Sequence, residues 1–132
     1  MLDHVARYFI VLIVLVGGDA VWLSYFARAV FRPTLGGILL DDPRWWAAAL
    51  FYPLFALGVV VFALSSGRRK TSWRNSIFYG ALFGFIAYAT YDLTNLATLK
   101  AWTPALAIVD IVWGTLLSGA AALGAHAGWR RA

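Results

Sequence analysis

The chain has 132 residues, of which 62% are hydrophobic and only 13% carry a charge, whereas a soluble domain carries roughly 25% charged residues. Its net charge of +5 lies mainly at the ends of apolar runs and in the segments between them, which favours the positive-inside pattern of membrane proteins over a nucleic-acid-binding patch. The absence of cysteine excludes disulfides, thiol catalysis and cysteine-ligated metal centres.

Four apolar runs predict four membrane-spanning helices, because a helix needs about 20 mainly apolar residues to cross a bilayer. They cover approximately residues 8–29, 45–65, 76–99 and 104–127. The segments between them are short, so we predict one all-α domain over residues 1–132, an integral membrane four-helix bundle. The first run is too long for a signal peptide, and it contains Asp19, so we expect a permanent helix.

The first two predicted helices differ in their polar content. Asp19 lies near the middle of the first helix, on one face with Leu15 and Trp22. The second helix carries no charge but contains Pro53, which we expect to kink it and to free a backbone carbonyl.

The third and fourth predicted helices are joined by a few residues near position 101, so they must be antiparallel neighbours. Asp92 lies nine residues before Ala101 and Asp110 nine residues after it, which places both carboxyl groups at a similar depth. Each aspartate shares its helix face with small and polar residues, which allow helices to approach closely. These are Gly80, Gly84, Tyr88, Tyr91, Asn95 and Thr98 on the third helix, and Thr103, Ala107, Trp113, Gly114, Ser118, Ala121 and Gly124 on the fourth. We therefore predict that the aspartates point into the bundle.

The distribution of basic residues predicts that both termini lie in the cytoplasm. One side of the membrane would hold most of them, namely Arg7, Arg68, Arg69, Lys70, Arg74, Arg130 and Arg131. The other side would hold Arg28, Arg32, Arg44 and Lys100, partly offset by Asp41 and Asp42. Cytoplasmic segments carry the excess of Lys and Arg, so the fuller side is assigned to the cytoplasm.

Three of the four predicted helices each bring one aspartate into the membrane, at a cost of roughly 2.5–3.5 kcal/mol for each acid. Ionisable residues inside a membrane are functional candidates by default. The sequence predicts a binding site formed by Asp19, Trp22, Tyr88, Tyr91, Asp92, Asn95, Asp110 and Trp113. No Lys or Arg lies within the predicted spans apart from Arg28 near an end, so we expect protonated acids or a bound cation. In the alternative, each aspartate only joins helices by hydrogen bonds to tyrosine and tryptophan.

Other kinds of site have little support in the sequence. His4 and His126 lie at the chain ends, far in depth from the aspartates, so we expect no metal site and no cofactor. Neither Ser24 nor Ser118 is placed beside a histidine base, which argues against a serine-type triad.

Four stretches resemble domain-of-unknown-function family 2177, a family of small bacterial membrane proteins. They are GDAVWLSYFAR (Gly18–Arg28), FYPLFALGVVVFAL (Phe51–Leu64), YGALFGFIAYATYDLTNLATLKAW (Tyr79–Trp102) and VDIVWGTLLSG (Val109–Gly119). The resemblance implies a four-helix protein of the bacterial inner membrane, and it implies no particular activity, substrate or cofactor.

The leading functional prediction is a membrane protein that binds or transports a cationic or amphipathic small molecule, with proton exchange as an option. Carboxylates and aromatic faces together suit organic cations. Membrane lipid would surround it, no nucleic acid would bind it, and its small size suggests a homodimer if it transports. Two alternatives remain open: an enzyme acting on a lipid or quinone-like substrate with Asp92 and Asp110 as catalytic acid and base, and an accessory subunit of a larger membrane complex.

Overall fold

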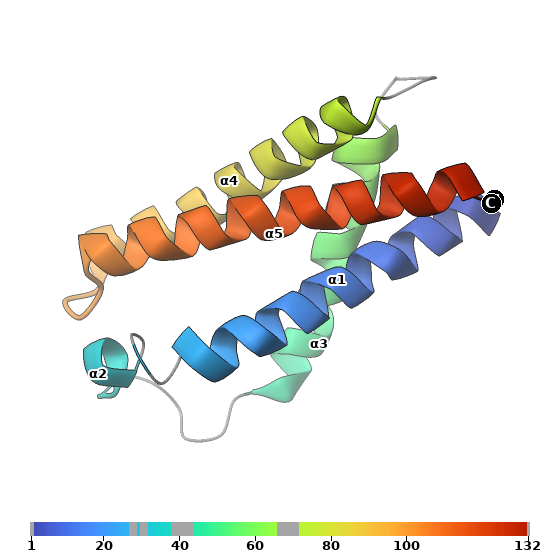
Figure 1. The fold of residues 1–132 in the computed structure, drawn as a ribbon. Coiled ribbons are helices and arrows are strands. Elements are labelled where there is room, and N and C mark those ends of the chain that lie inside the picture. Colours follow the sequence, from blue (N-terminus) through green and yellow to red (C-terminus); the bar gives the residue numbers. More distant parts are fainter. Residues whose placement is uncertain (1, 27–28, 30–31, 38–43, 66–71, 132) are drawn as a thin grey trace.

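The chain is all-α, as predicted, in a computed structural model that describes residues 2–26, 29, 32–37, 44–65 and 72–131. Its long helices are α1 (Leu2–Phe26), α3 (Trp45–Val59), α4 (Trp73–Thr98) and α5 (Pro104–Arg131). A short helix, α2 (Arg32–Leu35), follows α1, and a π-helical segment, η2 (Val60–Ser65), continues α3. Three of the helices, α1, α4 and α5, run roughly alongside one another, while α3 runs across them (Figure 1).

Local sequence signals explain where the helices of the α4–α5 hairpin begin. The Ser72 hydroxyl accepts a hydrogen bond of 3.2 Å from the backbone N–H of Asn75 and so caps α4. Thr103 does the same for α5, accepting from the N–H of Leu106 at 3.1 Å. Pro104 is the first residue of α5, where a missing N–H costs nothing. The turn between the helices is thus fixed from both of its ends.

Helices α4 and α5 pack along most of their length through two facing rows in which every fourth residue is buried or partly buried. Down the rows, Asp92 faces Asp110, Tyr88 faces Gly114, Gly84 faces Ser118, Gly80 faces Ala122, and Ser76 faces His126. A Cβ atom on Gly84 would collide with the Ser118 side chain, and one on Gly114 with the Tyr88 ring. Small residues therefore allow the close approach that brings the two aspartates together.

A compact apolar core joins α1, α3, η2 and α5. Its buried members are Val11, Leu15, Phe55, Ala56, Val59, Val60, Leu117, Ala121, Ala122 and Ala125. Many of them are alanines, and Gly18 of α1 lies directly against the Leu117 side chain. Pro53 does lie within α3, and the Tyr8 hydroxyl donates a hydrogen bond of 3.1 Å to its carbonyl oxygen. This contact ties α1 to α3 beside the proline.

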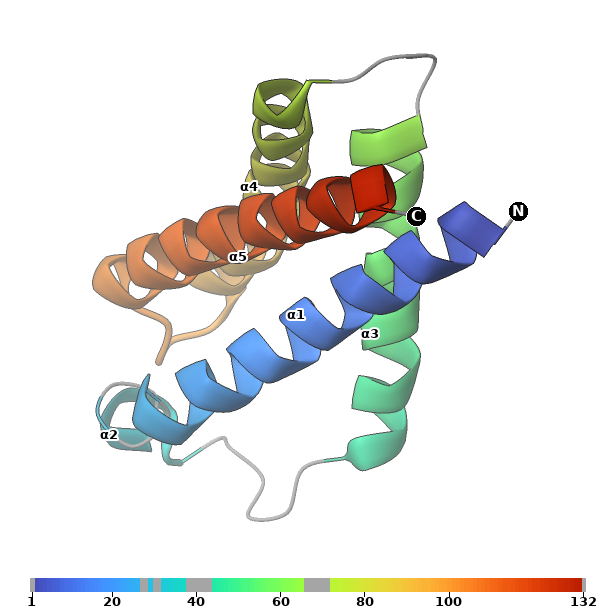
Figure 2. The same ribbon diagram turned by 45° about the vertical axis from the view of Figure 1, so that its right-hand side comes forward.

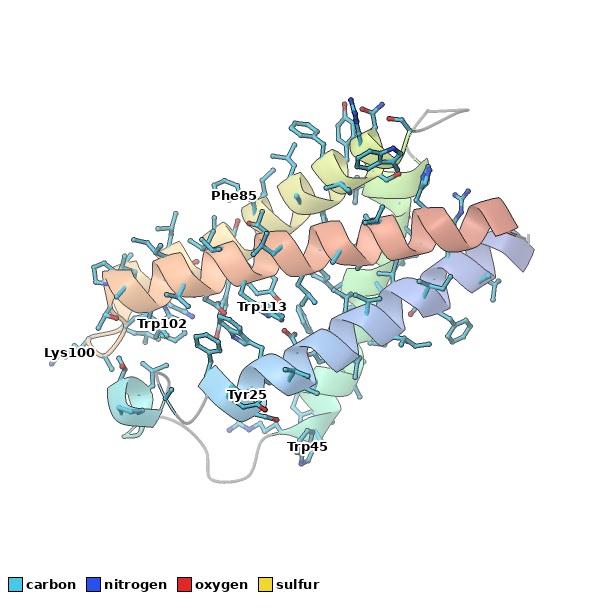
Figure 3. The ribbon with its side chains drawn as sticks, viewed as in Figure 1. Tyr25, Trp45, Phe85, Lys100, Trp102 and Trp113 are labelled. Carbon is cyan, nitrogen blue, oxygen red and sulfur yellow. The ribbon has the colours of Figure 1, made fainter. Side chains whose placement is uncertain are left out.

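The outer surface is apolar on all four long helices. Large apolar side chains that are more than half exposed include Phe9, Ile13, Leu54, Phe78, Ile86, Ile108 and Leu116. Phe85 of α4 likewise points away from the bundle (Figure 3). Monomeric soluble proteins rarely expose contiguous apolar patches of this extent, so the surface is suited to lipid.

Three of the described helices are long and apolar enough to cross a membrane. The spans are Val5–Phe26, Trp45–Phe62 and Pro104–His126. The fourth predicted span, residues 76–99 in α4, is not among them. Helix α4 has 26 residues, so its length suffices, and its deficit is one of composition. Asp92, Asn95 and several threonines lower its hydropathy.

The first and last helices bring the two ends of the chain together. Helix α1 begins and α5 ends at the same end of the molecule (Figure 2). The basic cluster of Arg68, Arg69 and Lys70, on which the cytoplasmic assignment depends, lies outside the described residues, and the assignment stays a prediction.

Candidate functional site

Three aspartates are buried in the interior, and they come from three different helices. Asp92 is 0% exposed, and Asp19 and Asp110 are each 8% exposed. Asp19 is in α1, Asp92 in α4 and Asp110 in α5. The carboxyl groups of Asp92 and Asp110 are immediate neighbours, and Asp19 lies within electrostatic range of Asp110. All three acids therefore share one region of the core.

Asp19 is fully engaged in hydrogen bonds to two other helices. Its Oδ2 accepts from the Tyr52 hydroxyl of α3 at 2.7 Å, and its Oδ1 accepts from the Trp113 indole Nε1 of α5 at 2.8 Å. Figure 3 shows Trp113 in the space between α5 and α1. One carboxyl group thus holds α1, α3 and α5 together, which is the joining role that the sequence left open for all three acids.

Asp92 is in the opposite situation. Among the residues that the structure describes, neither of its carboxyl oxygens has a hydrogen-bond partner, although the side chain is completely buried. The indole N–H of Trp102, in the turn before α5, is close enough to interact with Asp92 but makes no hydrogen bond either. An unpartnered buried polar group costs about 1–3 kcal/mol, and more if it is charged, so this group of atoms is suited to receive a ligand.

Tyr88 links the two parts of the site. Its ring packs against Gly114 of α5, and its phenol interacts electrostatically with Asp19, Asp92 and Asp110. The tyrosine therefore lies between the engaged carboxyl of Asp19 and the unpartnered carboxyl of Asp92.

Aromatic rings form two groups beside the acids. Trp22 stacks on Trp113 with ring centroids 4.5 Å apart and on Phe26 at 3.8 Å. Tyr91 meets Trp102 edge to face at 5.7 Å. The Trp22 indole nitrogen, like that of Trp102, is buried without a hydrogen-bond partner.

Two of the eight predicted site residues lie at the margin. Tyr91 was predicted on the packing face of α4, but it is 54% exposed. Asn95, one turn further along α4, is partly buried. The remaining six lie together: Asp19, Asp92 and Asp110 are buried, and Trp22, Tyr88 and Trp113 are partly buried beside them.

Three polar residues of the interior, Tyr52, Trp102 and Ser76, were not predicted as site residues from the sequence. Tyr52 and Trp102 both border the acids, and each was hidden among aromatic residues that are typical of membrane interfaces. At the other end of the α4–α5 rows, the buried Ser76 hydroxyl lies 3.0 Å from Nδ1 of the buried His126. The sequence signal for Ser76 was its place in a four-residue repeat that runs from Asp92 through Tyr88, Gly84 and Gly80 to Ser76.

The donor set limits the chemistry of the site. Among the described residues, no group of three histidine, cysteine or acidic side chains could hold a metal ion. The two neighbouring carboxyl groups offer acceptor oxygens, and within the described part of the chain both oxygens of Asp92 are unpartnered. The arrangement can therefore take a proton or an organic cation.

Comparisons with known proteins agree with the apolar surface. No curated protein and no solved structure matches the chain. A family profile described as "Predicted membrane protein (DUF2177)" matches residues 4–127, which cover nearly the whole chain. The protein belongs to this family of membrane proteins.

Proposed function

We propose that this membrane protein binds a cationic, amphipathic small molecule at Asp92 and Asp110. The observation that carries the proposal is the complete burial of Asp92 without a hydrogen-bond partner for either carboxyl oxygen. A cation between the two carboxyl groups would supply both the missing charge and the missing donors.

A purely structural role accounts for Asp19 but not for Asp92. Hydrogen bonds between membrane helices contribute only about 0.6 kcal/mol on average, and Asp92 makes none. Burying this acid costs roughly 2.5–3.5 kcal/mol, and within the described residues neither of its oxygens makes a hydrogen bond that would offset this cost. A ligand that offsets it is the simplest physical reason for an acid at this position.

We also propose that α4 crosses the membrane together with the three apolar spans. Its 26 residues extend about 39 Å, and its exposed threonine hydroxyls are satisfied within the helix. Thr90, Thr94 and Thr98 donate to the carbonyls of Ile86, Thr90 and Thr94, respectively. Within its central and C-terminal parts, Asp92 points inward and Asn95 lies at the margin, so this stretch presents few unpaired polar groups to lipid.

The proposed location is the bacterial inner membrane, with both termini in the cytoplasm, as the family resemblance and the basic residues indicate. If the protein carries its ligand across the membrane, we propose that it does so as a homodimer, because a single chain contributes few helices. Cross-linking in native membranes would detect the pair.

The test is a ligand-dependent thermal shift of the purified, detergent-solubilised chain. A hydrophobic amine should raise the unfolding temperature of the wild type but not that of Asp92→Asn or Asp110→Asn. Asp42→Asn is the matched control, because it removes one carboxylate at a position that the sequence places outside the four predicted spans. Equal shifts in the wild type and Asp92→Asn would refute the proposal.

A further inference from the structure

We infer that the ligand is a protonated amine that carries at least two N–H groups, in preference to a quaternary ammonium or a metal ion. The inference rests on the proposed function and specifies the chemistry of the bound group. It depends on counting the donors and acceptors at the Asp92–Asp110 pair.

The pair has an excess of acceptors. Both oxygens of Asp92 are unpartnered and inaccessible to solvent. Its immediate neighbour Asp110 is another acceptor, and the Trp102 indole N–H is an unpartnered donor beside Asp92. A carboxylate has about four acceptor positions, so a ligand that brings several N–H donors matches what is missing.

A quaternary ammonium would satisfy the charge but not the hydrogen bonds. Its cation is surrounded by methyl groups, so the Asp92 oxygens would stay without donors in a water-poor interior, at about 1–3 kcal/mol for each group. Aromatic cages recognise quaternary ammonium groups without carboxylate hydrogen bonds, and here the carboxyl groups are central while Tyr91 is more than half exposed.

A metal ion fits less well than an ammonium group. Calcium takes six to eight oxygen ligands and magnesium requires near-octahedral coordination, whereas two carboxyl groups meet here. Among the residues that the structure describes, no third acidic or histidine side chain completes a metal-binding group. Asp19, the third buried acid among the described residues, has both oxygens engaged by Tyr52 and Trp113.

The experiment uses four probes that share a benzyl group and a positive charge at pH 7 and differ in N–H count. These are benzylamine, N-methylbenzylamine, N,N-dimethylbenzylamine and benzyltrimethylammonium. Their affinities for the full-length, detergent-solubilised protein are measured by titration calorimetry. We expect benzylamine and N-methylbenzylamine to bind about tenfold or more tightly than N,N-dimethylbenzylamine and benzyltrimethylammonium, because each of the latter two lacks at least one of the two required charge-assisted hydrogen bonds.

Variants separate this inference from the proposed function. In Asp92→Asn the preference for N–H-bearing probes should disappear, and in Asp42→Asn it should be unchanged. If benzyltrimethylammonium binds the wild type as tightly as benzylamine and Asp92→Asn abolishes both, the cation site stands and the N–H requirement is wrong. If all four probes bind the wild type and Asp92→Asn equally, or none binds the wild type, both proposals fail.

Discussion

Asp19 and Asp92 are both buried, but they differ in role because they differ in their hydrogen-bond partners. Asp19 accepts from Tyr52 and Trp113, while Asp92 has no partner at either oxygen. Removing a satisfied acid breaks contacts among helices, whereas removing an unsatisfied one relieves a cost. Substitutions at the two positions should therefore affect stability and binding differently.

Tyr52→Phe removes one of the two donors to Asp19 and leaves the ring in place. We expect the free energy of unfolding to fall by roughly 1 kcal/mol, between the membrane average of about 0.6 kcal/mol and the value of about 1.5–3 kcal/mol for bonds to charged groups. Unfolding in mixed micelles measures this change. Tyr25→Phe is the control, because Tyr25 is 73% exposed and should be neutral; equal effects would argue against the role of Asp19 in joining helices.

Asp92 and Asp110 should hold a shared proton at neutral pH when no cation is bound. Two carboxyl groups side by side in an apolar interior cannot both ionise without a large repulsion. Infrared difference spectra of the purified protein should show a protonated carboxyl band that is lost in Asp92→Asn. A spectrum with both groups ionised and no bound cation would contradict this expectation.

At the scale of the helices, the α4–α5 pair is organised by the two rows in which every fourth residue faces a partner. Gly80, Gly84 and Gly114 lie where a side chain would collide with the opposite helix. The Asp92–Asp110 pair lies at one end of the rows, and the Ser76–His126 contact lies at the other end. The position of the acid pair thus depends on small residues as far as three turns away.

Gly84→Leu should force α4 and α5 apart. Overpacking of a close contact costs about 1–3 kcal/mol, and we expect a lower unfolding temperature together with weaker binding of benzylamine. Gly17→Leu is the matched control, since no atom lies within 4 Å of a Cβ added there. An unchanged unfolding temperature in Gly84→Leu would show that the helices are not held as closely as the rows require.

At the scale of the whole molecule, the three aspartates lie inside, and large apolar side chains are exposed on all four long helices. Such a surface suits a solvent that cannot hydrogen bond. Three helices are apolar enough in composition to lie in lipid. Helix α4 is less apolar, but its Asp92 points inward and its threonine hydroxyls bond to its own backbone.

The natural absence of cysteine makes the proposed topology testable by single-cysteine labelling. A cysteine at Ser72, before α4, should react with a membrane-impermeant maleimide from the cytoplasmic side of the membrane. A cysteine at Lys100, after α4, should react from the opposite side. Labelling of both from the same side would mean that α4 does not cross the membrane.

Much of the fold could be predicted from the sequence because lipid imposes simple rules. Long apolar runs require helices, and a short connection requires antiparallel neighbours. The meeting of Asp92 and Asp110 followed from their equal distances to Ala101. The steep course of α3 across α1 could not be predicted, because α3 is apolar on all sides and its sequence marks no preferred face.

The details of the site depended on pairs that are distant in sequence. Tyr52 is separated from Asp19 by 33 positions and Trp113 by 94. Any of several tyrosines and tryptophans could have reached that carboxyl group, and only the packing of α1 against α3 and α5 selects these two. Periodicity predicted an inward Tyr91, but a residue one position from Asp92 is rotated by about 100°, and its ring lies at the edge of the helix pair, against Trp102.

The partners of Asp19 also have a consequence for biogenesis. Helix α1 is synthesised before α5 and brings an acid toward the bilayer, and one of the two hydrogen-bond donors to that acid, Trp113, follows only 94 positions later. A nascent chain therefore carries an incompletely satisfied carboxyl group until Trp113 has been made. Termination before Trp113 would leave that defect permanent, giving quality-control proteases a physical feature by which to distinguish an incomplete product from a finished one.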